Sequence, residues 1–146
     1  MGNGLSPALQ KLFAERKLMK MRTDRKLVLK ELAAAKADLK DAQESLKIGK
    51  SKWGTIQGYY SMFHSARALL YEKGFREKSH YALLSAISEL YIDEIERSLI
   101  QDFEHAMYLR QEADYGLKFS ASGAQGVIKT AEQLLDRASA LLKTRS

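Results

Sequence analysis

Cysteine is absent from this chain of 146 residues, and proline occurs only once. The lack of cysteine excludes disulfide scaffolds, thiolate zinc sites and cysteine nucleophiles. Because proline breaks helices, its near absence beside many Ala, Leu, Lys and Glu residues predicts an all-α protein. No apolar run approaches the roughly 18 residues of a membrane-spanning helix, and the N-terminal region lacks the apolar stretch of a signal peptide. We therefore expect a cytoplasmic protein that makes no membrane contact.

The positive charge is concentrated at the beginning of the chain. The net charge is +6, but residues 1–52 carry 13 Lys and Arg against 6 Asp and Glu, and the rest is close to neutral. The basic residues are densest between Lys11 and Lys30. This segment is either an electrostatic arm for nucleic acid or an acidic partner, or the solvated face of an exposed helix.

Apolar periodicity predicts a series of helices joined by short connections. Residues 1–27 are expected to form a basic helical extension, and residues 28–146 an up-and-down bundle of four or five helices. Helix starts are expected at Ser6-Pro7, Asp24, Ser51, Ser79 and Asp93, and helix ends at Gly49, Gly74 and Gly116. A loose stretch from Gly116 to Gly126, with a hinge at Gly123–Gly126, is expected before a last helix that carries Val127 to Leu141.

Two arginines interrupt the apolar stripes of these helices. Arg67 continues the stripe of Ile56, Tyr60, Phe63 and Leu70, and Arg110 continues that of Leu99, Phe103, Ala106 and Ala113. A buried unpaired charge is costly, so each arginine is either in an ion pair, for example with Asp114, Glu112 or Glu89, or lines a groove that binds phosphate. We expect both in one polar cluster with Asp114 as the carboxylate.

The histidines are acid–base candidates because the imidazole pKa lies near neutrality. His64 shares a helix face with Arg67, and His80 begins a helix, although both could be core or capping residues. His105 is interpreted as a surface or packing residue. Three histidines without cysteine predict no metal site, and no cofactor is expected. Seven tyrosines suit interfaces and base stacking, and about half should be core residues.

Three segments resemble small prokaryotic HEPN-domain proteins. Residues 59–70 (YYSMFHSARALL) look like the second helix of that family, and Glu72-Lys73-Gly74 with Lys78-Ser79-His80 continue the pattern. Residues 110–115 (RQEADY) look like its Arg-x-x-Ala-Asp-Tyr signature. The resemblance covers about residues 33–144. It implies a helical bundle, a homodimer and, for many relatives, pairing with a minimal nucleotidyltransferase in a toxin–antitoxin or related complex.

This sequence differs from the ribonuclease branch of the family in the motif that begins at Arg110. That branch cuts RNA at the dimer cleft with an Arg-x(4–6)-His motif, and Arg110 can fill the arginine role. Tyr115 and Gly116 stand five and six residues later, and no histidine follows Arg110. In some relatives a nucleotidyltransferase adenylylates a tyrosine just after the histidine, of which Tyr115 is a loose analogue.

Three functions remain open after the sequence analysis. The favoured hypothesis is a module that binds nucleotide or RNA in an inter-helix or dimer cleft, with a nucleotidyltransferase as partner. The alternatives are a metal-independent ribonuclease toxin, in which Arg110 acts with His64 or His80, and a non-catalytic helical adaptor. The residues expected to line the cleft are Tyr60, His64, Arg67, His80, Arg110, Asp114 and Tyr115.

Overall fold

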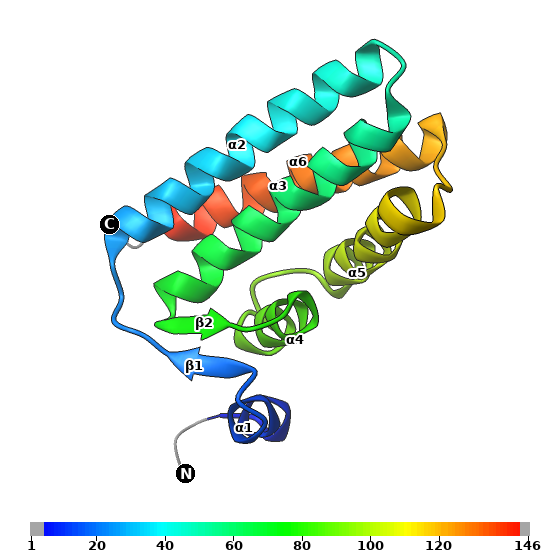
Figure 1. The fold of residues 1–146 in the computed structure, drawn as a ribbon. Helices are drawn as coiled ribbons and strands as arrows, with labels where there is room; N and C mark the ends of the chain where they lie inside the picture. Colours follow the sequence, from blue (N-terminus) through cyan, green and yellow to red (C-terminus); the bar gives the residue numbers. More distant parts are fainter. Residues whose placement is uncertain (1–4, 144–146) are drawn as a thin grey trace.

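The computed structural model describes residues 5–143 and has an all-α fold, as the sequence predicts (Figure 1). Residues 1–4 and 144–146, the outer ends of the two expected domains, lie outside the described part. The elements are α1 (Pro7–Ala14), β1 (Leu18–Lys20), α2 (Arg25–Lys47), α3 (Ser51–Glu72), β2 (Phe75–Glu77), α4 (His80–Leu90), α5 (Arg97–Gln111), the π-helical turn η1 (Glu112–Gly116) and α6 (Ala121–Lys143).

The helix boundaries follow from local side-chain and backbone chemistry. The side chains of Ser6, Asp24 and Ser79 accept hydrogen bonds from the first free backbone N–H groups of α1, α2 and α4. Gly49 and Gly74 follow α2 and α3 with φ values of +80° and +82°, which glycine adopts without a steric penalty. The sequence signals for these starts and ends are therefore confirmed.

Helix α3 is the central element of the bundle. Figure 1 shows α2 and α6 running beside it along most of its length, with α5 along α6. The two helices α3 and α6 pack tightly at Gly58, where an added Cβ atom would lie 2.9 Å from Cγ1 of the buried Val127. Most of α3 is therefore buried, and the expected stripe of Tyr60, Phe63 and Arg67 is instead its partly exposed side.

A short two-stranded sheet is the main feature that the sequence did not predict. Strands β1 and β2 are antiparallel, and Leu18 lies opposite Glu77. Each strand has three residues, too few to show an alternating pattern. Leu9 and Leu12 of α1 and Leu18 of β1 are buried in the same core as the long helices, so residues 5–20 pack against the body of the protein.

The region after α5 also differs from the expectation. The helix expected from Asp93 begins at Arg97 and ends in the π-helical turn, and α6 begins at Ala121. Gly123 and Gly126 therefore lie inside a continuous helix, and the expected hinge is wrong. None of the helices formed by residues 5–143 is long and apolar enough to cross a membrane.

Candidate functional site

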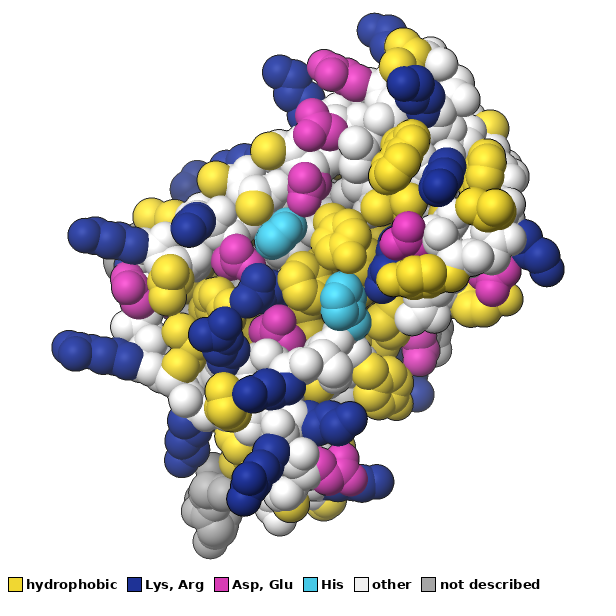
Figure 2. All heavy atoms as spheres, in the orientation of Figure 1, with side chains coloured by type: hydrophobic (Ala, Val, Ile, Leu, Met, Phe, Trp, Pro, Cys, Tyr) yellow, Lys and Arg dark blue, Asp and Glu magenta, His cyan; other side chains and the backbone are white. Residues whose placement is uncertain are grey.

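One face of the molecule brings together histidine, aromatic and charged side chains. Figure 2 shows two histidine rings set among hydrophobic side chains, with basic and acidic side chains around them. The aromatic group comprises Tyr59, Tyr60 and Phe63 of α3 together with His80, the first residue of α4. The His80 ring packs against the rings of Phe63 and Tyr59, with centroid distances of 4.5 and 5.7 Å.

Arg110 lies against this aromatic group from α5. Its guanidinium carbon is 5.3 Å from the ring centre of Tyr59, 5.7 Å from that of Tyr60 and 6.0 Å from that of Tyr115. The residue is only 7% exposed, because its stripe on α5 faces the core as the sequence predicts. A cation that faces aromatic rings is stabilised by their electron-rich faces.

The charge of Arg110 is only weakly paired. One Nη atom donates a 3.4 Å hydrogen bond to Asp114, four residues later, as expected from the sequence. Its buried Nε atom has no hydrogen-bond partner among residues 5–143. Hydrogen bonds to charged groups are usually about 2.7–2.9 Å long, so this contact leaves most of the donor capacity of the guanidinium free. An anion could therefore bind to Arg110 without displacing a strong ion pair.

The π-helical turn positions the carboxylate and the ring beside Arg110. It carries both Asp114 and Tyr115, and Tyr115 is 78% exposed. The turn is followed by Leu117, whose left-handed φ of +56° is unfavourable for a branched side chain. Such π-helical insertions are often found at functional sites.

A partly buried hydrogen bond joins Tyr59 to His80. The Tyr59 hydroxyl lies 2.6 Å from Nδ1 of His80, and the Tyr59 side chain is fully buried. Burial raises the pKa of the Tyr59 phenol far above its usual value, although the nearby charge of Arg110 opposes this effect. Burial also lowers the pKa of His80, and the positive charges of Arg110 and Arg67 lower it further. Both groups are thus uncharged at neutral pH.

Arg67 lies on the other side of the aromatic group and is strongly paired. Its Nη1 atom is 3.2 Å from Glu31 of α2, and its Nε atom is 3.1 Å from Glu77 of β2. It also donates a hydrogen bond to the Tyr71 hydroxyl and packs on the ring of Phe63. Burial raises the pKa of Glu77, against the effect of Arg67. Arg67 therefore connects three elements through ion pairs.

His64 connects α3 to α2 beside this cluster. Its Nδ1 atom is 3.3 Å from Glu31, and its Nε2 atom is 3.5 Å from Asp38. Burial raises the pKa of Asp38, while the nearby His64 opposes this effect. Because both ring nitrogens face carboxylates, His64 has no free nitrogen for proton transfer at Arg110.

The structure brings the expected cleft residues to one face but divides them into two groups. Tyr60, His80, Asp114 and Tyr115 belong with Arg110, whereas His64 belongs with Arg67. The two arginines share the aromatic group between them but not a carboxylate, which differs from the expected common partner Asp114.

Sequence reasoning missed Tyr59, Glu31 and Glu77 as members of these groups. The sequence signal for Tyr59 was its place beside Tyr60, four residues before Phe63, which puts an aromatic cluster on one helix. The two glutamates carry no comparable local signal.

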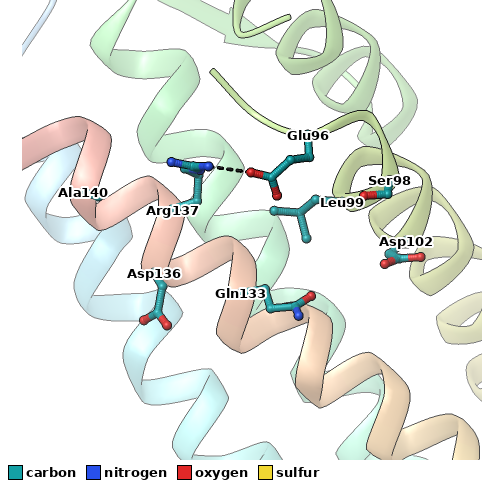
Figure 3. Close-up of a pocket in the computed structure, with 8 residues that line it drawn as sticks. All are labelled: Glu96, Ser98, Leu99, Asp102, Gln133, Asp136, Arg137 and Ala140. Atoms are coloured by element: carbon teal, nitrogen blue, oxygen red, sulfur yellow. Dashed lines mark hydrogen bonds and ion pairs between the residues drawn. The ribbon is translucent and has the colours of Figure 1, made fainter. Parts of the chain in front are cut away.

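A hollow lies away from these residues, between α5 and α6. It has a volume of about 530 Å³ and is lined by Glu96, Ser98, Leu99, Asp102, Gln133, Asp136, Arg137 and Ala140. Figure 3 shows the ion pair between Glu96 and Arg137 beside it. His105 is exposed in an adjoining hollow of about 410 Å³. Residues 5–143 contain no group of three or more histidine, aspartate or glutamate side chains that could hold a metal ion.

Comparisons with known proteins place this arrangement in a family. The sequence profile of the HEPN domain matches residues 29–144. A UPF0332 protein of Archaeoglobus fulgidus is 31% identical over 116 residues, which are 74% of this chain and 90% of that protein. "Putative toxin MJ0605" of Methanocaldococcus jannaschii is 34% identical over 93 residues, which are 60% of this chain and 67% of that protein.

A solved structure has the same fold. The crystal structure of TT1696 from Thermus thermophilus superimposes with a TM-score of 0.67 and 16% sequence identity, covering 77% of this chain and 95% of the other. At this identity the likeness supports the fold alone. Because the profile spans residues 29–144 and the Archaeoglobus fulgidus relative is 31% identical over 90% of its own length, this protein belongs to the HEPN domain family.

Proposed function

We propose that Arg110 binds a phosphate group of a nucleotide or of RNA beside the aromatic group. The observation that carries this proposal is the buried guanidinium, whose one carboxylate contact is 3.4 Å long and whose Nε atom has no partner in the described part. A planar, permanently charged guanidinium can bind a phosphate through two parallel hydrogen bonds. Arg67 is held by two carboxylates, so we assign it the role of joining α3 to α2 and to strand β2.

The surroundings of Arg110 also suit the rest of a nucleotide. Tyr115 is highly exposed, and Tyr60 is partly exposed beside the guanidinium. Exposed aromatic rings stack on bases of any sequence, a contact worth about 1–3 kcal/mol per base. A second copy of the chain would complete the site if the protein forms the homodimer that the family resemblance implies.

At the level of the cell, we propose a toxin-like role together with a nucleotidyltransferase partner. The relative from Methanocaldococcus jannaschii that carries the name of a toxin supports the first part. The ribonuclease alternative needs a group beside Arg110 that can accept a proton. His64 faces two carboxylates, and the Nδ1 atom of His80 is bound to Tyr59. Phenols are in general poor bases at neutral pH, so the hydroxyl of Tyr115 is not a suitable group either. Binding without metal-independent cleavage is therefore the function we favour.

The binding test uses AMP and a six-nucleotide single-stranded RNA as probes. Wild-type protein should bind at least one of them, and Arg110→Ala should weaken that binding at least about tenfold, because a charged hydrogen bond is worth about 1.5–3 kcal/mol. Arg137→Ala is the matched control, since it removes an arginine whose ion pair with Glu96 lies on the surface. Equal affinities of the wild-type protein and Arg110→Ala would refute the proposed site.

The partner test uses genomic neighbourhood and purified components. We expect a nucleotidyltransferase reading frame beside this gene. When its product is co-expressed with this protein, the two proteins should elute together in size-exclusion chromatography. Separate elution of the two proteins at micromolar concentration would refute the nucleotidyltransferase partnership and would favour the adaptor hypothesis. Incubation of the purified protein with mixed RNA in the absence of metal should leave the RNA intact.

A further inference from the structure

The hydrogen bond between Tyr59 and His80 leaves one imidazole nitrogen available. The bond uses Nδ1 of His80, and Nε2 makes no hydrogen bond with any atom of residues 5–143. His80 is partly exposed, whereas the Tyr59 side chain is fully buried. The ring also packs against Phe63 at 4.5 Å, so its orientation is fixed by neighbours on α3.

The burial of Tyr59 and the neutral state of both groups indicate which nitrogen of His80 carries the proton. Burial raises the pKa of Tyr59, so its hydroxyl keeps the proton and can donate it in a hydrogen bond. The pKa of His80 is lowered by burial and by two arginines, so the imidazole is neutral at pH 7. A neutral imidazole has one N–H donor and one acceptor nitrogen. The buried Tyr59 hydroxyl has no hydrogen-bond partner other than Nδ1 among residues 5–143, and buried O–H groups are normally paired. We therefore assign Tyr59 as the donor to Nδ1, which leaves the proton of the imidazole on Nε2.

We propose that Tyr59 holds His80 in the Nε2–H form, and that this N–H donates to the same phosphate group that Arg110 binds. The proposal rests on the proposed function, because it takes the phosphate at Arg110 as its ligand. It adds a second recognition residue and a positioning residue to that site.

The geometry places His80 and Arg110 around the same pair of rings. The Arg110 guanidinium carbon lies 5.3 and 5.7 Å from the ring centres of Tyr59 and Tyr60. The His80 ring lies 5.7 and 6.1 Å from the same two centres. Arg110 would supply the charge, and the neutral imidazole would supply a directional donor without adding another cation to a site that already holds two arginines.

The same arrangement affects the chemistry that the site can perform. A nitrogen that carries a proton cannot accept one from the 2′-hydroxyl group of RNA, and Nδ1 is occupied by Tyr59. His80 in this form can therefore bind a phosphate but cannot serve as the general base of a ribonuclease. This gives a structural reason for binding without cleavage.

The first experiment measures the form of His80 directly, without a ligand. Long-range ¹H–¹⁵N correlation spectra of the protein at pH 7 should show Nε2 as protonated and Nδ1 as unprotonated. Tyr59→Phe should abolish this preference, whereas Tyr60→Phe, which removes the neighbouring hydroxyl, should keep it. A wild-type spectrum with the proton on Nδ1 would overturn the proposal.

The second experiment tests the donor with two variants of opposite geometry. The side-chain nitrogen of glutamine reaches about as far as Nε2, whereas that of asparagine reaches only about as far as Nδ1. His80→Gln should bind the probe within about threefold of the wild-type protein, and His80→Asn about tenfold more weakly, as expected for one lost hydrogen bond to a charged group. Thermal unfolding followed by circular dichroism verifies that both variants are folded.

Two probes distinguish the sources of the phosphate and the ways of failing. Binding of AMP that depends on both Arg110 and His80 indicates a nucleotide ligand, and such binding of the RNA hexamer alone indicates a phosphodiester. If Arg110→Ala weakens binding but His80→Asn does not, the proposed function stands and this inference is overturned. If Arg110→Ala binds both probes as the wild-type protein does, the proposed function fails and the role of His80 fails with it.

Discussion

Removal of the Arg67 side chain should destabilise the protein much more than removal of a surface arginine. In Arg67→Ala, the carboxylate of Glu77 loses its ion pair with Arg67, and that of Glu31 keeps only its contact with His64. The side chains of Glu31 and Glu77 are only 11% and 7% exposed. Removing one partner of a buried ion pair costs about 3–5 kcal/mol. Because the Arg67 side chain is 21% exposed, some solvent reaches the cluster, and we expect a loss of about 2–4 kcal/mol in the free energy of unfolding.

The pair between Arg137 and Glu96 provides the matched control. Its side chains are 41% and 62% exposed, and exposed ion pairs contribute about 0–1 kcal/mol. Arg137→Ala should therefore lower the free energy of unfolding by less than about 1 kcal/mol. Urea unfolding followed by circular dichroism at pH 7 measures both variants under the same conditions.

The loss of unfolding free energy in Arg67→Ala, here called the deficit, should also depend on pH. Burial raises the pKa of Glu77, and Arg67 opposes this, so the variant raises it further. A carboxyl group with a raised pKa binds its proton more tightly in the folded state, so a lower pH favours folding. The deficit should be largest at pH 7 and should shrink as the pH falls toward the pKa of the folded state. Adding Glu77→Gln should recover part of the loss at pH 7.

Two outcomes would refute this reasoning. A loss below about 1 kcal/mol would mean that the cluster contributes no more than a surface pair. A deficit that is the same at pH 5 and pH 7 would mean that an unpaired buried carboxylate is not its cause. Affinity for AMP should fall much less in Arg67→Ala than in Arg110→Ala, because Arg67 already has two carboxylate partners.

Three further predictions concern packing, charge and assembly. Gly58→Ala should destabilise the protein by about 1–2 kcal/mol, because the added Cβ atom would meet Val127. Gly126→Ala should stabilise it by about 0.5–1 kcal/mol, because there is open space around Gly126. Urea unfolding measures both changes. The double variant Lys26→Gln, Lys30→Gln should reduce the salt dependence of RNA affinity without changing the sequence preference, because basic contacts to phosphate act through counterion release. If the dependence of the affinity on salt concentration, measured by fluorescence anisotropy, has the same slope as in the wild-type protein, this prediction is wrong. Sedimentation of the protein at tens of micromolar should give twice the 16.5 kDa mass of the chain. Phe119→Glu, at an exposed apolar position, should shift the protein to the monomer. A wild-type protein that sediments as a monomer would exclude a binding site formed by two chains.

The helices and one half of the candidate site could be predicted from the sequence. Helix caps and the glycines that end helices act within a few residues, so their signals are local. The place of Arg110 on a buried stripe and its contact with Asp114 also follow from helical spacing, because residues four apart share a face. Arg67 was placed on a core-facing stripe by the same reasoning, but α3 is buried on most sides, and periodicity alone did not show which side remains open.

Only the tertiary structure decided the contacts between elements. Tyr59 and His80 are 21 residues apart, His64 and Glu31 are 33 apart, and Glu77 reaches Arg67 from a strand that has no sequence signal. These contacts depend on the angle and register at which α2, α4 and the small sheet pack on α3. Packing of that kind sums many weak contacts over the whole core, whereas helical periodicity is repeated every few residues. The sequence by itself therefore determined the helices and the exceptional place of Arg110, and the packing of α3 against its neighbours decided which side chains surround it.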